Sequence, residues 1–114
     1  MANNFVNKKV DITSAESAVT LYTIPSATTA IIKSILVSDD SGSGSSITIT
    51  LTDTSDAVFS IAYLKTISAN TPTEILTNPL VAETGEIIKV TAVQANRLHV
   101  ILSAMEVTPR TVTT

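Results

Sequence analysis

The strongest pattern in the chain is the apolar run at residues 29–38, Thr-Ala-Ile-Ile-Lys-Ser-Ile-Leu-Val-Ser. In a strand, successive side chains point to opposite faces. Six apolar residues then divide between the two faces, with Ala30, Ile32 and Leu36 on one and Ile31, Ile35 and Val37 on the other. This predicts a strand covered on both sides, inside a packed β domain or against a partner subunit. A helix is the competing interpretation, but the β-branched residues and the turn-forming flanks favour a strand.

Period-two alternation predicts further strands along the chain. Residues 47–52 alternate Ile or Leu with Thr, which gives one apolar and one hydroxyl face. The other predicted strands are residues 5–12, 19–24, 58–64, two short edge pieces within 67–76, 87–92 and 97–107. Turn-forming residues separate the strands, notably in a surface loop at residues 39–46 and a hairpin turn at residues 53–56.

These patterns predict an all-β fold, an antiparallel two-sheet β-sandwich of about eight strands. Jelly-roll-like and immunoglobulin-like sandwiches both fit that number of strands, and the absence of Cys and Trp favours the jelly roll. At 114 residues the chain is expected to form a single domain, residues 1–114. Within it, residues 1–12 are an N-terminal arm or first strand, and residues 108–114 a polar tail.

The composition predicts apolar surface beyond what one core can shelter. Charged residues make up 15% of the chain and hydrophobic residues 44%, against about 25% charged in ordinary globular proteins. Much of the polar surface must therefore be hydroxyl, from 19 Thr and 13 Ser. A net charge of −3, with basic residues scattered apart from Lys8-Lys9, argues against a nucleic-acid partner. We expect no membrane partner either, because the N-terminus lacks a signal core and no apolar run is of membrane-spanning length.

Few residues suggest chemistry. The only histidine, His99, is expected to face solvent or a neighbouring subunit, and no nucleophile motif accompanies it. One histidine without cysteine serves zinc poorly, and the acidic clusters at residues 39–42 and 53–56 do not match a calcium loop. Scattered glutamates leave a glycosidase pair open as an enzyme hypothesis. We expect no enzyme activity, cofactor or metal.

Six segments occur in an order that resembles a known group of proteins. They are VTLYTIP (19–25), TAIIKSILVS (29–38), ITITLTD (47–53), ISANTP (67–72), GEIIKVTA (85–92) and LHVILS (98–103). In pattern and phrase they resemble the small all-β virion structural proteins of tailed bacteriophages, especially marine ones. The resemblance covers roughly residues 17–107. It implies a non-enzymatic accessory, either capsid decoration or cement, or part of the neck, tail or fibre, and it provides no active-site residues.

The residues and the resemblance lead to one hypothesis, because surplus apolar surface marks interfaces. We expect a capsid decoration or cement protein that docks on the outside of the particle as a homo-oligomer, with a trimer favoured. Its partners would be its own copies and the major capsid or another virion protein, in virions assembled in the host cytoplasm. The candidate interface residues are Phe5, Val6, Val10, Ile31, Ile35 and Val37, with residues 2–10 as a docking or exchange segment.

Two alternatives remain open on the sequence. The protein could be a neck, tail or fibre accessory, because such parts of a phage particle use similar sandwiches. It could instead be a carbohydrate-binding module, which would need exposed aromatic platforms and has only Tyr22 and Tyr63 as tyrosines.

Overall fold

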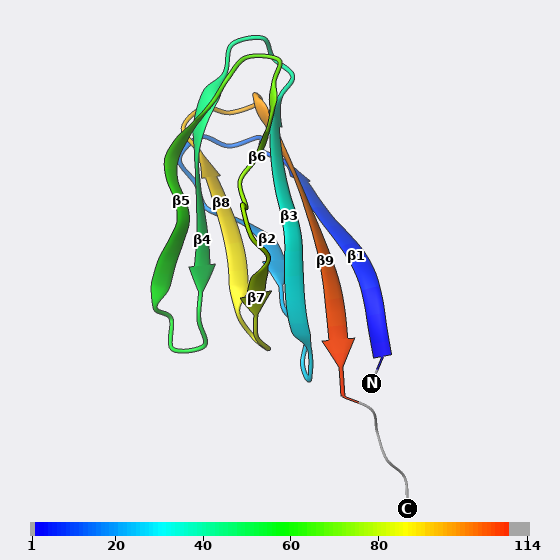
Figure 1. Ribbon diagram of the computed structural model, residues 1–114. Helices are drawn as coiled ribbons and strands as arrows, with labels where there is room; N and C mark the ends of the chain where they lie inside the picture. Colours follow the sequence, from blue (N-terminus) through cyan, green and yellow to red (C-terminus); the bar gives the residue numbers. More distant parts are fainter. Residues whose placement is uncertain (1, 110–114) are drawn as a thin grey trace, which may run out of the picture.

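The computed structural model describes residues 2–109, which form two antiparallel β-sheets packed face to face (Figure 1). The nine strands of these residues are β1 (Ala2–Asp11), β2 (Val19–Thr23), β3 (Thr29–Asp39), β4 (Ser45–Thr52), β5 (Val58–Ile67), β6 (Pro72–Glu74), β7 (Leu80–Ala82), β8 (Ile87–Ala92) and β9 (Leu98–Thr108). No helix that could cross a membrane is found within this part of the chain.

The strand order is that of a jelly roll. The first sheet runs β1-β9-β3, with β6 and β7 both paired to β3, and the second sheet runs β2-β8-β4-β5. When β6 and β7 are taken as one interrupted strand, each sheet contains four strand positions and the chain crosses repeatedly between the sheets, as in a jelly roll. The predicted all-β antiparallel sandwich is therefore confirmed.

The core lies between the inner faces of the two sheets. Ile35 and Val37 of the first sheet and Ile47, Ile49 and Val90 of the second have 0% of their surface exposed. On β4, these inward isoleucines alternate with threonines on the opposite face, as the sequence pattern predicts. Aliphatic side chains from both sheets thus form the hydrophobic core.

Two of the predicted elements differ from the structure. Residues 67–76 do not form two edge pieces, because Ile67 ends β5 and only β6 follows within that range. Strand β7 was not predicted, since it has only three residues and directly follows Pro79, which cannot donate a ladder hydrogen bond. Of the predicted polar tail, Thr108 belongs to β9, and residues 110–114 lie outside the described part of the chain.

A β-bulge in β3 corrects the predicted division of its faces. The register with β9 shifts between Ile32 and Ser34, so Lys33 is an extra residue in the strand. This extra residue reverses the alternation, and the residues facing the core are Ala30, Ile32, Ile35 and Val37. Ile31 and Leu36 are half-buried on the outer side. The prediction that Ile31, Ile35 and Val37 share one face is therefore wrong.

The Glu74 carboxylate stabilises the same region of β3 from the neighbouring edge. It accepts hydrogen bonds from the Ser34 hydroxyl, from the Ile35 backbone N–H at 2.9 Å and from the Leu76 N–H at 3.1 Å. The Ile35 carbonyl in turn accepts the Ile75 N–H at 2.9 Å. Glu74 thus binds the β3 backbone between the stretches paired with β6 and with β7.

Candidate interaction surfaces

An apolar row crosses the outer face of the first sheet. Phe5 of β1 is paired with Met105 of β9, Met105 with Ile31 of β3, and Ile31 with Val81 of β7. Phe5 is 74% exposed and Val81 55% exposed, while the two central side chains are half-buried. We call these four residues the apolar row. Side chains opposite each other on one face of a sheet touch, so the row is continuous across four strands.

A second row crosses the same face nearer the other end of the strands. Ile101 of β9 and Leu36 of β3 form its centre, with Lys9 of β1 and Glu74 of β6 at its two ends. We call it the mixed row. Between the two rows lie the polar residues Asn7, Ser103 and the bulged Lys33, which line a hollow of about 270 Å³. The outer face therefore has two ridges with a polar furrow between them.

The structure separates the six predicted interface residues into three groups. Phe5 and Ile31 lie together in the apolar row. Val6 and Val10 are half-buried and pack against the core. Ile35 and Val37 are fully buried inside the chain, so they offer no surface to a partner. That Phe5 and Ile31 contact a partner stays a prediction.

Sequence reasoning missed the other apolar residues of this face, Met105, Val81, Leu36 and Ile101. The alternation in β9 was a usable signal for Ile101, because Leu98, Val100 and Leu102 occupy the opposite face. Met105 and Val81 had no comparable signal, since their places beside Ile31 depend on pairings between distant strands.

Strand β5, at the edge of the second sheet, presents another apolar surface. Val58, Phe59, Tyr63 and Leu64 are each exposed over half or more of their surface. The β4 to β5 register shifts twice, and Leu64 has a left-handed φ of 49° with its N–H donated to the Thr48 hydroxyl at 3.1 Å. Such bulges redirect side chains, and they make it harder for another strand to pair with the exposed edge of the sheet. Adjacent apolar pairs, Val58-Phe59 and Tyr63-Leu64, were the sequence signal for this irregularity.

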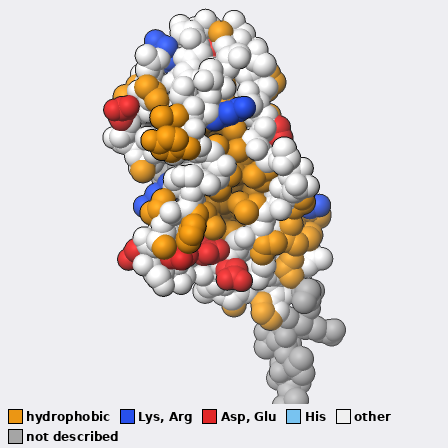
Figure 2. All heavy atoms as spheres, turned by 60° about the vertical axis from the view of Figure 1, so that its left-hand side comes forward, with side chains coloured by type: hydrophobic (Ala, Val, Ile, Leu, Met, Phe, Trp, Pro, Cys, Tyr) orange, Lys and Arg blue, Asp and Glu red, His pale blue; other side chains and the backbone are white. Residues whose placement is uncertain are grey.

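A hollow of about 370 Å³ lies between β5 and the segment that includes β6. Its lining includes Ile61, Tyr63, Lys65, Glu74 and Ile75, which bring apolar and polar groups together. Figure 2, which turns the β5 side forward, shows hydrophobic side chains both as projecting clusters and in the middle of this side. The side of the sandwich between β5 and β6 is therefore partly apolar.

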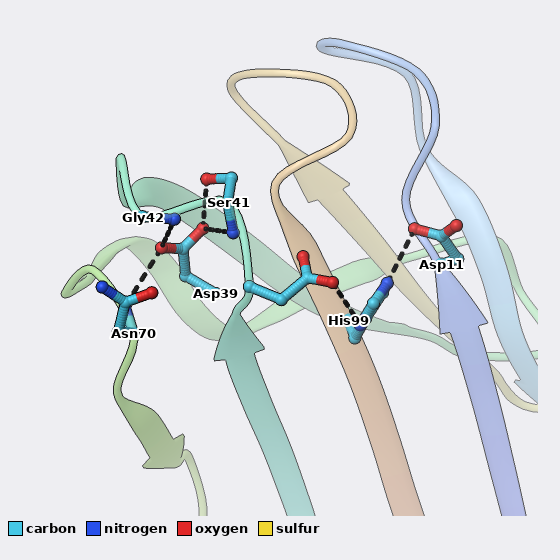
Figure 3. A network of polar contacts seen from close by, with 7 residues as sticks. Asp11, Asp39, Ser41, Gly42, Asn70 and His99 are labelled. Atoms are coloured by element: carbon cyan, nitrogen blue, oxygen red, sulfur yellow. Dashed lines mark hydrogen bonds and ion pairs between the residues drawn. The ribbon is translucent and has the colours of Figure 1, made fainter.

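His99 bridges two carboxylates at one end of the first sheet (Figure 3). Its Nε2 lies 3.1 Å from Asp11 Oδ1 and its Nδ1 lies 3.6 Å from Asp40 Oδ2, and 41% of the side chain is exposed. Both ring nitrogens face acids, so the geometry is that of a polar bridge between the ends of β1, β3 and β9. A nucleophile–base pair would instead need a hydroxyl or thiol beside one of these nitrogens. Within residues 2–109, no three metal-ligating side chains gather closely enough to hold an ion.

Asp39 organises the loop after β3. Its buried carboxylate accepts hydrogen bonds from the Ser41 hydroxyl and from four backbone N–H groups, those of Ser41, Gly42, Gly44 and Asn70, as Figure 3 shows in part. The Ser41 hydroxyl foremost, and then the backbone donors, hold the Asp39 pKa well below its ordinary value of 3.8 against the opposing effect of burial. Since its oxygens face donors, Asp39 has the environment of a loop anchor rather than a calcium ligand.

Gly44 is required by this loop. Its φ is +70°, and a Cβ there would lie 2.9 Å from the Ile67 carbonyl oxygen. Only glycine combines that backbone conformation with such a close approach. The loop at residues 39–46, predicted to lie at the surface, is thus packed closely against the end of β5 and is bonded through Asp39 to the turn that follows β5.

Comparisons with known proteins show a likeness in fold. The chain matches no protein family model and no curated protein. It is similar to a chain in the structure of the Gx strain of infectious bursal disease virus, with a TM-score of 0.55 and 15% identity over 93% of this chain and 32% of that one. A chain of the Gt strain gives a TM-score of 0.39, also at 15% identity, over 92% of this chain and 31% of that one. The chain thus spans about a third of the virus chains it matches, and the likeness to the Gx strain chain is one of fold.

Proposed function

We propose that this chain is a non-enzymatic virion structural protein, a capsid decoration or cement protein that docks on the outside of a tailed-phage particle as a homo-oligomer. The observation that supports this most directly is the exposed apolar surface. Large hydrophobic side chains stand exposed on the outer face of the first sheet and along β5, in a chain with only 15% charged residues. Apolar surface of this kind marks sites of contact with other proteins.

The fold also supports a role in a particle. A chain from a virus structure has a similar sandwich, as described above, and a rigid sandwich suits a protein that must present fixed surfaces to several neighbours. The His99 geometry adds no argument for catalysis, because its nitrogens face acids. We propose the major capsid protein, or another virion protein, as the second partner.

The test is to find the chain in purified particles. Phage particles from the culture that produces this protein would be banded on a density gradient and digested with trypsin, and peptides of the chain quantified against the major capsid protein. We expect the chain at a fixed ratio to that protein. Its absence from particles, despite abundance in the lysate, would contradict a virion role.

Immunogold labelling of the same particles then distinguishes the two candidate locations of the chain, the shell and the neck, tail or fibre. Labelling over the whole shell supports the decoration role. Labelling confined to the neck, tail or fibre would replace it with the accessory role that the sequence also allows.

A carbohydrate-binding role is the second candidate, because one observation favours it. Tyr63 is 74% exposed and borders the β5 hollow together with Lys65 and Thr77, so an aromatic face stands beside polar groups. If this hollow binds glycans, a glycan array should detect binding that Tyr63→Ala abolishes. Tyr22 is the matched contrast, since it is 2% exposed and its hydroxyl donates to Glu106, which leaves it no free face.

A further inference from the structure

We infer that the outer face of the first sheet packs against the same face of a second copy of this chain, about a two-fold axis parallel to the strands. The inference starts from the apolar row and the mixed row defined above. It does not depend on a virion role, and it differs from the trimer predicted from the sequence.

A two-fold axis along the strands has a definite effect on the rows. It keeps each row at the same height along the strands but exchanges the two ends of the row. The β1 end of one copy then faces the β6 and β7 edge of the other, and β9 faces β3. Strands of the two copies run in similar directions, which is the aligned packing that facing sheets prefer, within about 30°.

Under this operation the apolar row meets its own image. Phe5 of one copy faces Val81 of the other, and Met105 faces Ile31. Both contacts are apolar, and each occurs twice because a two-fold interface is self-complementary. The contact would cover Phe5 and Val81, which are largely exposed in the single chain.

The mixed row is complementary in the same arrangement. Ile101 faces Leu36 at its centre. At both ends Lys9 of one copy faces Glu74 of the other, whose carboxylate also accepts hydrogen bonds from Ser34 and from the Ile35 N–H of its own chain. Opposite charges at the rim of an apolar contact favour the correct alignment more than they add affinity. An axis perpendicular to the strands, placed between the rows, would instead set Phe5 opposite Lys9 and Val81 opposite Glu74.

The size of the face suits a contact of this kind. Strands of ten or eleven residues are roughly 35 Å long, and four strand positions are roughly 19 Å wide, which gives a face of roughly 650 Å². Stable protein interfaces bury about 800 Å² per partner, and transient ones somewhat less. A contact of this size would therefore have to involve the whole outer face of the first sheet, because a smaller part of it would bury too little surface.

Cysteine cross-linking tests this geometry directly, because the chain contains no cysteine. Two single variants, Phe5→Cys and Val81→Cys, are purified and treated with a short bismaleimide cross-linker, each alone and then as an equal mixture. Facing sheets pack roughly 10 Å apart, a gap that such a linker spans and that is too wide for a disulfide, which needs Cα atoms within about 7 Å. Each variant has a single cysteine, so every cross-link joins two copies, and Phe59→Cys on β5 is the control partner.

We expect a denaturing gel to show a cross-linked band at about twice the 12.0 kDa of one chain in the mixture, and little of it with either variant alone or with Phe59→Cys as partner. Equal dimer in the single-variant samples would overturn the proposed axis. A monomeric sedimentation profile of the native chain at about 100 µM, well above the dissociation constants of specific complexes, would overturn the contact itself. Neither result bears on whether the chain occurs in particles, which the gradient experiment decides separately.

Discussion

The two sheets are alike on their inner faces and differ across the middle of their outer faces. The apolar row Phe5, Met105, Ile31 and Val81 crosses the first sheet. The corresponding row on the second sheet is Ser60, Thr50, Lys89 and Thr20, which is polar throughout. Both sheets contribute fully buried isoleucines to the core. The difference teaches that the exposed apolar residues gather in two places, across the outer face of the first sheet and along the β5 edge of the second, while the middle of the second sheet's outer face is polar.

The largest effects should come from the inner faces, where the two sheets are equivalent. Ile35→Ala and Ile49→Ala each remove a fully buried side chain, one from each sheet. Each should lower the free energy of unfolding by about 2–5 kcal/mol, measured by urea denaturation. The matched Ile→Val variants should cost about 0.5–1.5 kcal/mol. A clearly smaller loss from one alanine variant would show that its sheet contributes less to the core.

The next largest effects on stability should come from the two aspartates that anchor loops, one at an end of each sheet. Asp39 accepts five hydrogen bonds, whereas Asp53, in the hairpin between β4 and β5, accepts the N–H groups of Ser55 and Ala57, both at 2.9 Å. Asp39→Asn should therefore destabilise the fold more than Asp53→Asn, as measured by thermal unfolding. Equal effects would mean that the Asp39 loop is not an anchor.

The Asp39 variant should also change the acid response of stability. Because its folded pKa lies below its ordinary value of 3.8, the unfolded chain takes up the proton first as the pH falls. The stabilisation from Asp39 is therefore complete above that value and is lost as the pH falls below it. Denaturation of the native chain between pH 6 and pH 2 should show a decline in this window that is shallower in Asp39→Asn.

A smaller effect distinguishes the bulges of the two sheets. Glu74→Ala leaves the Ile35 N–H of β3 without its acceptor and should cost about 1–3 kcal/mol. Thr48→Val removes the hydroxyl that accepts the Leu64 N–H in β5, but that strand is exposed and water can replace the acceptor. Chemical denaturation should show the smaller loss for Thr48→Val. The reverse order would indicate that the β5 bulge, rather than β3, is under greater constraint.

The smallest effect on stability should accompany the clearest effect on association. Ile101→Lys and Thr50→Lys place the same charge at the centre of each outer face, and both should change the free energy of unfolding by only about 0.5 kcal/mol, as is usual for surface substitutions. Sedimentation should show weaker self-association for Ile101→Lys and none of this weakening for Thr50→Lys. If both variants associate as the native chain does, the outer face of the first sheet is not the contact.

The sequence by itself determined the class of fold and the position of most strands. Period-two alternation, as in Ile47, Ile49 and Leu51 against their threonines, is a local signal, because burial on one side of a strand requires it. The composition also predicted surplus apolar surface. It did not predict where that surface lies, because the composition is the same for every possible pairing of the strands.

Only the tertiary structure decided the faces of β3 and the outer rows. The bulge at Lys33 reversed the alternation that follows it, and so moved Ile35 and Val37 into the core and Leu36 out of it. The apolar row joins side chains from positions 5, 31, 81 and 105, which become neighbours only through the order and register of four strands. Register is a property of strand pairing, and pairing is set by the packing of the whole sandwich, which no local pattern contains.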